Sequence, residues 1–303
     1  MATISAAVLA RQDDHTSEAV LKLLKGNAAF EALSVTEGND IVTRDQEDDV
    51  KLAVGIQYAV SKGVLPKDPH VDPVTKIVVT GKSADEVANE IIAAFPSRSG
   101  NVIVLQGLSG TGKGTTVKRL QAVLPHCVCW SNGNVFRTFT HLASQHCEAQ
   151  GIEFSKEVLT PELLHSFVQR LAFEKFDDCF DVTIDGSIRV NTIQNTTLKM
   201  PIISSRVPTV AELTQGEVVL FAAKAVDTLR EAGCNVILEG RAQTLNYIPT
   251  PLRFELVMEN VSLLGERRAA QRVMAAAQKA LGGASDASDE AVTEAVLKVV
   301  ETL

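Results

Sequence analysis

The sequence predicts an α/β protein built on a parallel five-stranded β-sheet. From Asn101 onward, apolar runs of strand length alternate with helical patterns, which is typical of a parallel sheet with helices on its faces. One of these strands leads directly into a glycine-rich loop and a helix. Hydrophobic residues make up 45% of the 303 residues and charged residues 22%, a globular composition that argues against intrinsic disorder. A length of 303 residues by itself favours two domains or one large one.

The N-terminal third of the chain predicts helices, a loop and one strand. Apolar residues recur at helical spacing behind a capping Thr16 or Ser17, and Ser83 and Glu86 form a capping box. The elements predicted here are, in order, a helix over 16–33, a polar stretch over 37–49, a helix over 50–60, a proline-rich loop over 63–74, a buried strand over 75–80, a helix over 83–95 and a linker over 96–100.

The remainder predicts the strand–helix alternation and an antiparallel insertion. The elements expected there are strands over 102–106 and 126–130, the glycine-rich loop 107–115, a helix over 116–123, a helix over 161–176, antiparallel strands over 181–184, 187–193 and 197–203, parallel strands over 235–238 and 252–258, a helix over 262–281 and a last helix to residue 303.

The glycine-rich loop is the most specific motif. Gly107, Gly110 and Gly112 lack side chains that would obstruct a loop folding its amides around a diphosphate. Lys113 then adds a positive charge, and the following helix points its positive dipole end at the same oxygens. The sequence therefore predicts the phosphate-binding loop of a P-loop NTPase. Gly114 stands between the lysine and Thr115, and this Gly-Lys-Gly-Thr form resembles nucleoside monophosphate kinases.

Charge and cysteine content narrow the class of partner. Lys and Arg number 29 against 37 Asp and Glu, for a net charge of −8, which argues against wrapping nucleic acid or coating an anionic membrane. An aromatic content of 5% argues against base-stacking platforms. No apolar run is long enough to span a membrane, and no basic segment precedes the apolar N-terminal stretch, so no signal peptide is expected. Five sparse cysteines predict reduced thiols and a cytoplasmic location, with those on the 126–130 strand serving as apolar fillers rather than zinc ligands.

Beyond the loop, the sequence resembles the cytidylate kinases. Their Ser-Gly-x-x-Tyr-Arg turn appears as Asn132-Gly-Asn-Val-Phe136-Arg137, and their Asp-Gly-Arg-Asp as Glu239-Gly-Arg241-Ala242. Residues 266–272, Glu-Arg-Arg-Ala-Ala-Gln-Arg, resemble the arginine-rich helix that leads into that family's lid. The resemblance implies a three-layer P-loop NTPase fold with an inserted antiparallel acceptor-binding subdomain and a lid, and ATP-dependent phosphoryl transfer to CMP or dCMP.

The last third of that family pattern is found at the opposite end of this chain. Arg44, Asp48 and Lys51 have the spacing of its lid pattern Arg-x-x-x-Asp-x-x-Arg, and the 75–80 strand with the helix after Ser83 resembles its last strand and helix. We therefore expect a circular permutation, joined through the 96–100 linker. It predicts that residues 77–79 lie in the same sheet as 102–105, and that both chain ends lie near the lid. The expected segments are an N-terminal helical segment (1–38), a lid with the last core strand and helix (39–99), and a kinase core (100–303) with an acceptor-binding insertion at about 150–232.

The resemblance also implies roles for individual residues, with ATP and Mg²⁺ as cofactors. The expected catalytic residues are Lys113, Arg44, Lys51, Arg137 and Arg241. ATP is expected to bind Gly107, Ser109, Gly110, Thr111, Gly112, Lys113, Gly114 and Thr115, with Thr115 also contacting Mg²⁺. The acceptor nucleotide is expected to bind Asn132, Phe136, Arg137, Arg206, Gln215, Lys224, Glu239, Arg241 and Asp48. We expect a monomer whose partner is a nucleoside monophosphate.

Departures from the family pattern leave the identity of the phosphoryl acceptor undetermined. Ala242 replaces an aspartate that helps to read the base, Phe136 lacks a tyrosine hydroxyl, and Lys51 cannot bind phosphate bidentately as arginine does. Two alternatives therefore remain: a non-catalytic nucleotide-binding module derived from a kinase, and a P-loop kinase of a small metabolite.

Overall fold

A five-stranded parallel sheet forms the centre of the computed structural model, which describes residues 3–12, 14–177, 179–260, 262–283 and 287–303. The strand order is β1-β8-β2-β7-β3. The strands are β1 (Thr75–Val78), β2 (Val102–Gly107), β3 (Cys127–Trp130), β7 (Asn235–Gly240) and β8 (Arg253–Val257). Because β1 pairs with β8 and β8 with β2, the prediction that residues 77–79 share a sheet with 102–105 is confirmed. As the edge strand, β1 buries only Ile77 among its four residues, so the predicted buried strand is half exposed.

Helices cover both faces of this sheet, as the strand–helix alternation predicts. On one face, Ile103 and Leu105 pack with α4 (Ala84–Ile92) and α5 (Lys113–Val123). On the other, Val102 and Val104 pack with α6 (Gly133–Gln150) and α9 (Pro201–Glu231). The alternation of β2 side chains between the two clusters follows from the two-residue repeat of a strand. Ser83 forms the predicted capping box at the start of α4.

A separate small antiparallel sheet follows α7 (Pro161–Gln169) and consists of β4 (Leu171–Lys175), β5 (Phe180–Ile184) and β6 (Ile188–Arg189). The helix predicted over 161–176 is thus too long, because residues 171–175 pair with β5. The strands predicted over 187–193 and 197–203 are mostly wrong. After the two residues of β6 come α8 (Val190–Ile193), a 3₁₀ turn η1 (Thr197–Lys199) and the long α9, which begins at Pro201. Proline suits the first turn of a helix because its missing N–H has no helical acceptor there.

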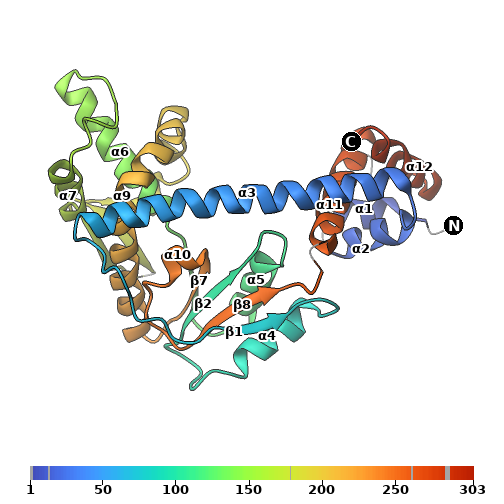
Figure 1. The fold of residues 1–303 in the computed structure, drawn as a ribbon, viewed down its shortest axis with the longest axis horizontal. Coiled ribbons are helices and arrows are strands. Elements are labelled where there is room, and N and C mark those ends of the chain that lie inside the picture. Colours follow the sequence, from blue (N-terminus) through green and yellow to red (C-terminus); the bar gives the residue numbers. More distant parts are fainter. Residues whose placement is uncertain (1–2, 13, 178, 261, 284–286) are drawn as a thin grey trace.

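A single 34-residue helix, α3 (Ala28–Ser61), crosses the molecule above the sheet in the view of Figure 1. Two predictions are corrected here. The helix predicted over 16–33 is interrupted after α2 (Asp14–Leu23), where Gly26 has φ +79° and Asn27 caps α3. The polar stretch 37–49 is helical, so the segment boundary predicted between residues 38 and 39 lies within α3.

Helices from both ends of the chain form a distal bundle with α11 and the first half of α3. The bundle contains α1 (Ala6–Arg11), α2, α11 (Ser262–Ala280) and α12 (Asp289–Val300), packed around an apolar cluster of their own. The N–H of Ile4 donates to Oγ1 of Thr293 at 3.3 Å, which places the start of α1 beside α12 (Figure 1). The two ends of the chain therefore meet at the far end of α3.

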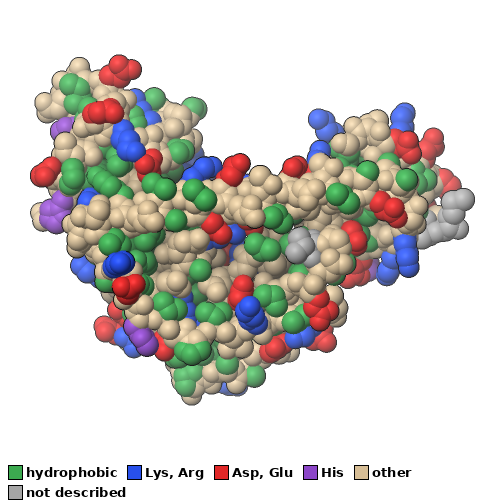
Figure 2. Space-filling view, viewed as in Figure 1, with side chains coloured by type: hydrophobic (Ala, Val, Ile, Leu, Met, Phe, Trp, Pro, Cys, Tyr) green, Lys and Arg blue, Asp and Glu red, His purple; other side chains and the backbone are tan. Residues whose placement is uncertain are grey.

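No helix in the described ranges is long and apolar enough to cross a membrane. On the face shown in Figure 2, acidic and basic side chains are interspersed over the surface.

Candidate functional site

The glycine-rich loop lies at the carboxyl end of the central strand β2. At Gly107 (φ +145°) a Cβ atom would lie 2.6 Å from the carbonyl oxygen of Leu256, so only glycine fits this position. Gly110 and Gly112 also have positive φ, a region that suits glycine. Gly112 caps α5 without a side-chain hydrogen bond, so the first amides of α5 remain available to a ligand.

Lys113 folds back over this loop. Its Nζ donates to the carbonyl oxygens of Gly107 at 2.7 Å and Leu108 at 2.9 Å. Burial lowers the pKa of Lys113, and the nearby guanidinium of Arg241 lowers it further, whereas Glu239 and Asp45 oppose that change. Two cationic side chains are therefore held close together beside the loop.

A cavity of about 820 Å³ opens over the loop, within the size range of small-molecule sites. The sheet contributes Glu239, Gly240 and Arg241 at the end of β7, while Ser17, Glu18, Arg267 and Gln271 come from α2 and α11 of the distal bundle. The cationic side chains that line it are Lys82, Lys113, Lys118, Arg241 and Arg267. The sheet core and the distal bundle thus share one cationic cavity, in which all eight predicted ATP-binding residues but Gly107 take part.

Asp45 is a site residue that the sequence reasoning missed. It lies in the middle of α3 with its side chain only 2% exposed, and its carboxylate accepts the backbone N–H and the hydroxyl of Ser109, both at 2.8 Å. Arg241 binds the same carboxylate through both terminal nitrogens, at 3.0 Å and 2.6 Å. The only sequence signal was its place between Arg44 and Asp48, within the lid pattern.

The pKa of Asp45 reflects this setting. Burial alone would raise it, but the hydrogen bonds from Arg241 and Ser109 and the charge of Arg241 outweigh burial and lower the pKa to about 2. The carboxylate is therefore ionised at any ordinary pH.

This lowered pKa predicts an acid-sensitive contribution to stability. A group whose folded pKa is depressed stabilises the fold above its unfolded pKa, near 3.8, and loses that effect as pH falls to about 2. We expect Asp45→Asn to be less stable than wild type by about 2 kcal/mol at pH 7, with the difference shrinking between pH 4 and 2. Urea denaturation at several pH values measures this difference, and a difference that stays constant over that window would contradict the prediction.

The predicted lid residues lie on α3 rather than in a loop. Arg44, Asp48 and Lys51 fall three and four residues apart, so they share one side of the helix. The side chain of Arg44 is 55% exposed and that of Lys51 is 72% exposed, whereas Asp48 is half-buried. None of the three is among the residues that line the cavity over the loop.

Arg137 lies partly buried near the start of α6. Its Nη1 donates to the carbonyl oxygen of Gly133 at 3.4 Å, and its Nε is buried without a hydrogen-bond partner within the described part of the chain. Asn132 accepts the indole N–H of Trp130 at 2.7 Å, and Phe136 packs against the core. Of these three predicted acceptor residues, Arg137 is the one with a buried side-chain donor that has no partner among the described residues.

The acceptor residues predicted on the insertion are not brought together. Arg206, Gln215 and Lys224 all lie on α9, and a rise of 1.5 Å per residue separates the first from the last by about 27 Å. Arg206 stacks over Phe154, with its guanidinium carbon 4.5 Å from the ring centroid. Gln215 is buried where α9 meets Gly55 of α3, and Lys224 is exposed. These three residues cannot bind one nucleotide together in this structure.

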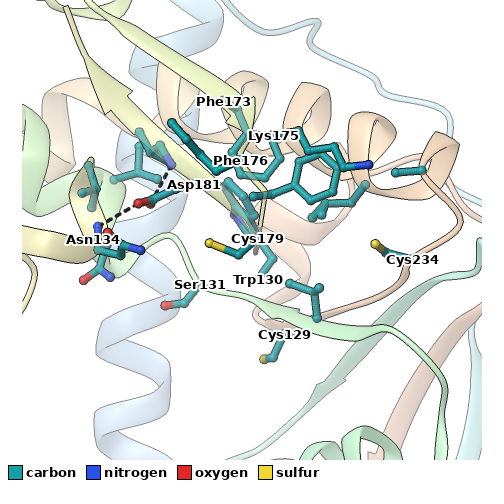
Figure 3. Close-up of a pocket in the computed structure, with 18 of the residues that line it drawn as sticks. Cys129, Trp130, Ser131, Asn134, Phe173, Lys175, Phe176, Cys179, Asp181 and Cys234 are labelled. Carbon is teal, nitrogen blue, oxygen red and sulfur yellow. Dashed lines mark hydrogen bonds between the residues drawn. The ribbon is translucent and has the colours of Figure 1, made fainter. Parts of the chain in front are cut away.

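A second cavity of about 820 Å³ follows the outer edge of β3 and faces the small sheet (Figure 3). Trp130, Phe173 and Phe176 line it together with Asn134 and Asp181, and none of the predicted acceptor residues takes part.

Cys127, Cys129, Cys179 and Cys234 also line this second cavity. Burial raises the pKa of Cys127 to about 11, so its thiol stays protonated. Among the residues that the structure describes, no group of three or more His, Cys, Asp or Glu side chains could hold a metal ion.

Neither a protein-family model nor a curated protein sequence matches this chain.

Proposed function

We propose that this chain is an ATP-dependent kinase of a nucleoside monophosphate, with CMP or dCMP as the acceptor. The observation that carries the proposal is the cavity over residues 107–115, where the loop, the start of α5 and Arg241 face one space. Phosphoryl transfer depends on positioning and charge neutralisation rather than on covalent chemistry by the protein. The amides at the start of α5, which have no helical acceptor, and the several cations of the cavity supply both.

The residues of the cavity fit a nucleoside triphosphate with its Mg²⁺. Lys113 would move from the loop carbonyls to the phosphates, and Arg241 and Arg267 would bind phosphate oxygens from the β7 and α11 sides. The exposed Thr115 offers a hydroxyl oxygen to Mg²⁺, and Glu239 lines the same cavity. Mg²⁺ in such sites is held mainly by substrate phosphates and water, and it would neutralise charge on the transferred group.

The acceptor nucleotide would bind between α6 and α3, near the carboxyl ends of the parallel strands. Arg137 has a buried Nε that needs an acceptor, and an anionic oxygen of the monophosphate would satisfy it. On α3, Arg44 and Lys51 face solvent and Asp48 is half-buried. These three residues would complete the acceptor site only when α3 and α6 approach one another.

Three features support the circular permutation. The relocated strand β1 completes the sheet beside β8, the start of α1 lies against α12, and the bundle formed by helices from the two chain ends lines the cavity. Chain ends that lie close together can be relinked at little cost in stability.

An ADP-release assay over CMP, dCMP, UMP and AMP tests the proposed activity. We expect ATP turnover to rise at least about 10-fold on addition of CMP or dCMP, because positioning the acceptor converts slow hydrolysis into transfer. ATP binding without acceptor-stimulated turnover would favour the non-catalytic module. Stimulation of ATP turnover by a small metabolite, but by none of the monophosphates, would favour a kinase that phosphorylates a small metabolite.

A further inference from the structure

The contact between Asp45 and the loop uses the donors that a phosphate would need. Asp45 takes both the N–H and the hydroxyl of Ser109, and it takes the two terminal nitrogens of Arg241 in a bidentate pair. The Nε of Arg241 faces Asp49 at 3.9 Å. Both edges of this guanidinium are therefore directed at carboxylates of α3, although Arg241 also lines the cavity.

We propose that Asp45 is a built-in competitor for the phosphoryl group, holding Arg241 and Ser109 until a ligand phosphate takes its place. The proposal rests on the phosphate site proposed above. A carboxylate and a phosphoryl group offer similar pairs of anionic oxygens to an arginine fork. In the absence of ligand, the carboxylate neutralises the partly buried guanidinium of Arg241, which lies near the ammonium of Lys113.

Asp45 weakens phosphate binding whether or not its side chain moves away. If the carboxylate stays, it repels an incoming phosphate across a poorly solvated space, and if it leaves, its bonds to Arg241 and Ser109 must first break. Either way, the charge of Asp45 costs free energy on phosphate binding.

The position of Asp45 also links the ligand to the distal bundle. The residue lies near the middle of α3, and two turns earlier the buried Glu37 pairs with Arg268 and Arg272 of α11. On the same α11, Arg267 lines the cavity. Release of Asp45 would free the middle of α3 from the loop, so that the bundle and its Arg267 could approach the bound phosphates.

Calorimetric titration with MgATP tests the competition. We expect Asp45→Asn to bind MgATP about 10-fold more tightly than wild type, a factor common for coupled sites. Asp49→Asn removes the second carboxylate that faces Arg241 and leaves every proposed phosphate donor in place, so it should bind MgATP about two- to threefold more tightly. Asp40→Asn, which removes an equal charge from an exposed position of α3, should bind like wild type.

The titration results distinguish a failure of the Asp45 competition from a failure of the phosphate-binding site itself. Wild-type binding of MgATP with equal or weaker binding by Asp45→Asn would overturn the competition and leave the phosphate site standing. No binding by wild type, Asp45→Asn or Asp49→Asn would overturn both. If Asp45→Asn does not fold, Asp49→Asn decides, because affinity at or below that of wild type would overturn the competition of the α3 carboxylates for Arg241.

Discussion

Lys113→Ala is expected to lower the rate of phosphoryl transfer by roughly 10³-fold while the protein stays folded. The Nζ of Lys113 lies inside the loop, within 2.7 and 2.9 Å of two loop carbonyls, and its pKa is lowered mainly by burial. A desolvated ammonium at this place interacts strongly with phosphate charge because little water screens it. Alanine at the first position of α5 favours the helix, so the loop and sheet should persist.

The measurement is ADP release at saturating ATP and acceptor, with circular dichroism as the check on folding. Lys76→Ala is the matched control, since Lys76 is an exposed lysine on the edge strand β1 whose ammonium lies 3.8 Å from Glu255. A Lys113→Ala enzyme with an unaffected rate would refute the phosphate-binding role of the loop.

Gly265→Ala is expected to destabilise the protein by about 3 kcal/mol, because it inserts a methyl group where two helices touch. A Cβ at Gly265 of α11 would lie 2.1 Å from the carbonyl oxygen of Ser34 and 2.9 Å from the backbone nitrogen of Gly38 in α3. Backbone atoms cannot move aside as a flexible side chain does, so α3 and α11 would have to separate. Arg267 lies two residues further along α11 and would shift with it.

Gly38→Ala offers a control from the same crossing. A Cβ there would meet the Cα of Gly265 at 3.6 Å, an ordinary contact, and replacing glycine by alanine inside a helix is favourable by up to about 1 kcal/mol. We expect this variant to be as stable as wild type or slightly more stable. Urea denaturation measures the free energy of unfolding of both variants. Equal destabilisation by the two substitutions would contradict the prediction that the close contact at Gly265 determines how α3 packs against α11.

The long helices α3 and α9 were missed for related reasons. The polar run around Glu37 and Asp45 breaks the apolar period of α3, yet both carboxylates are buried because Arg272 and Arg241 pair with them from positions far along the chain. In α9, the prolines at 201 and 208 and the β-branched residues between them predict extended backbone structure. Packing of one side of α9 against the sheet overrides that local preference.

The five parallel strands, the capped helix α4 and the glycine-rich loop could be predicted from the sequence alone. Their signals are local: a short apolar run, a cap three residues from its partner, and glycines where a backbone must turn. Only the tertiary structure decided that Asp45 meets Ser109 and Arg241, that the distal bundle lines the loop cavity, and that Arg206, Gln215 and Lys224 stay apart. A site assembled from groups nearly 200 residues apart depends on how α3 packs against the core, and no local pattern in the chain records that packing.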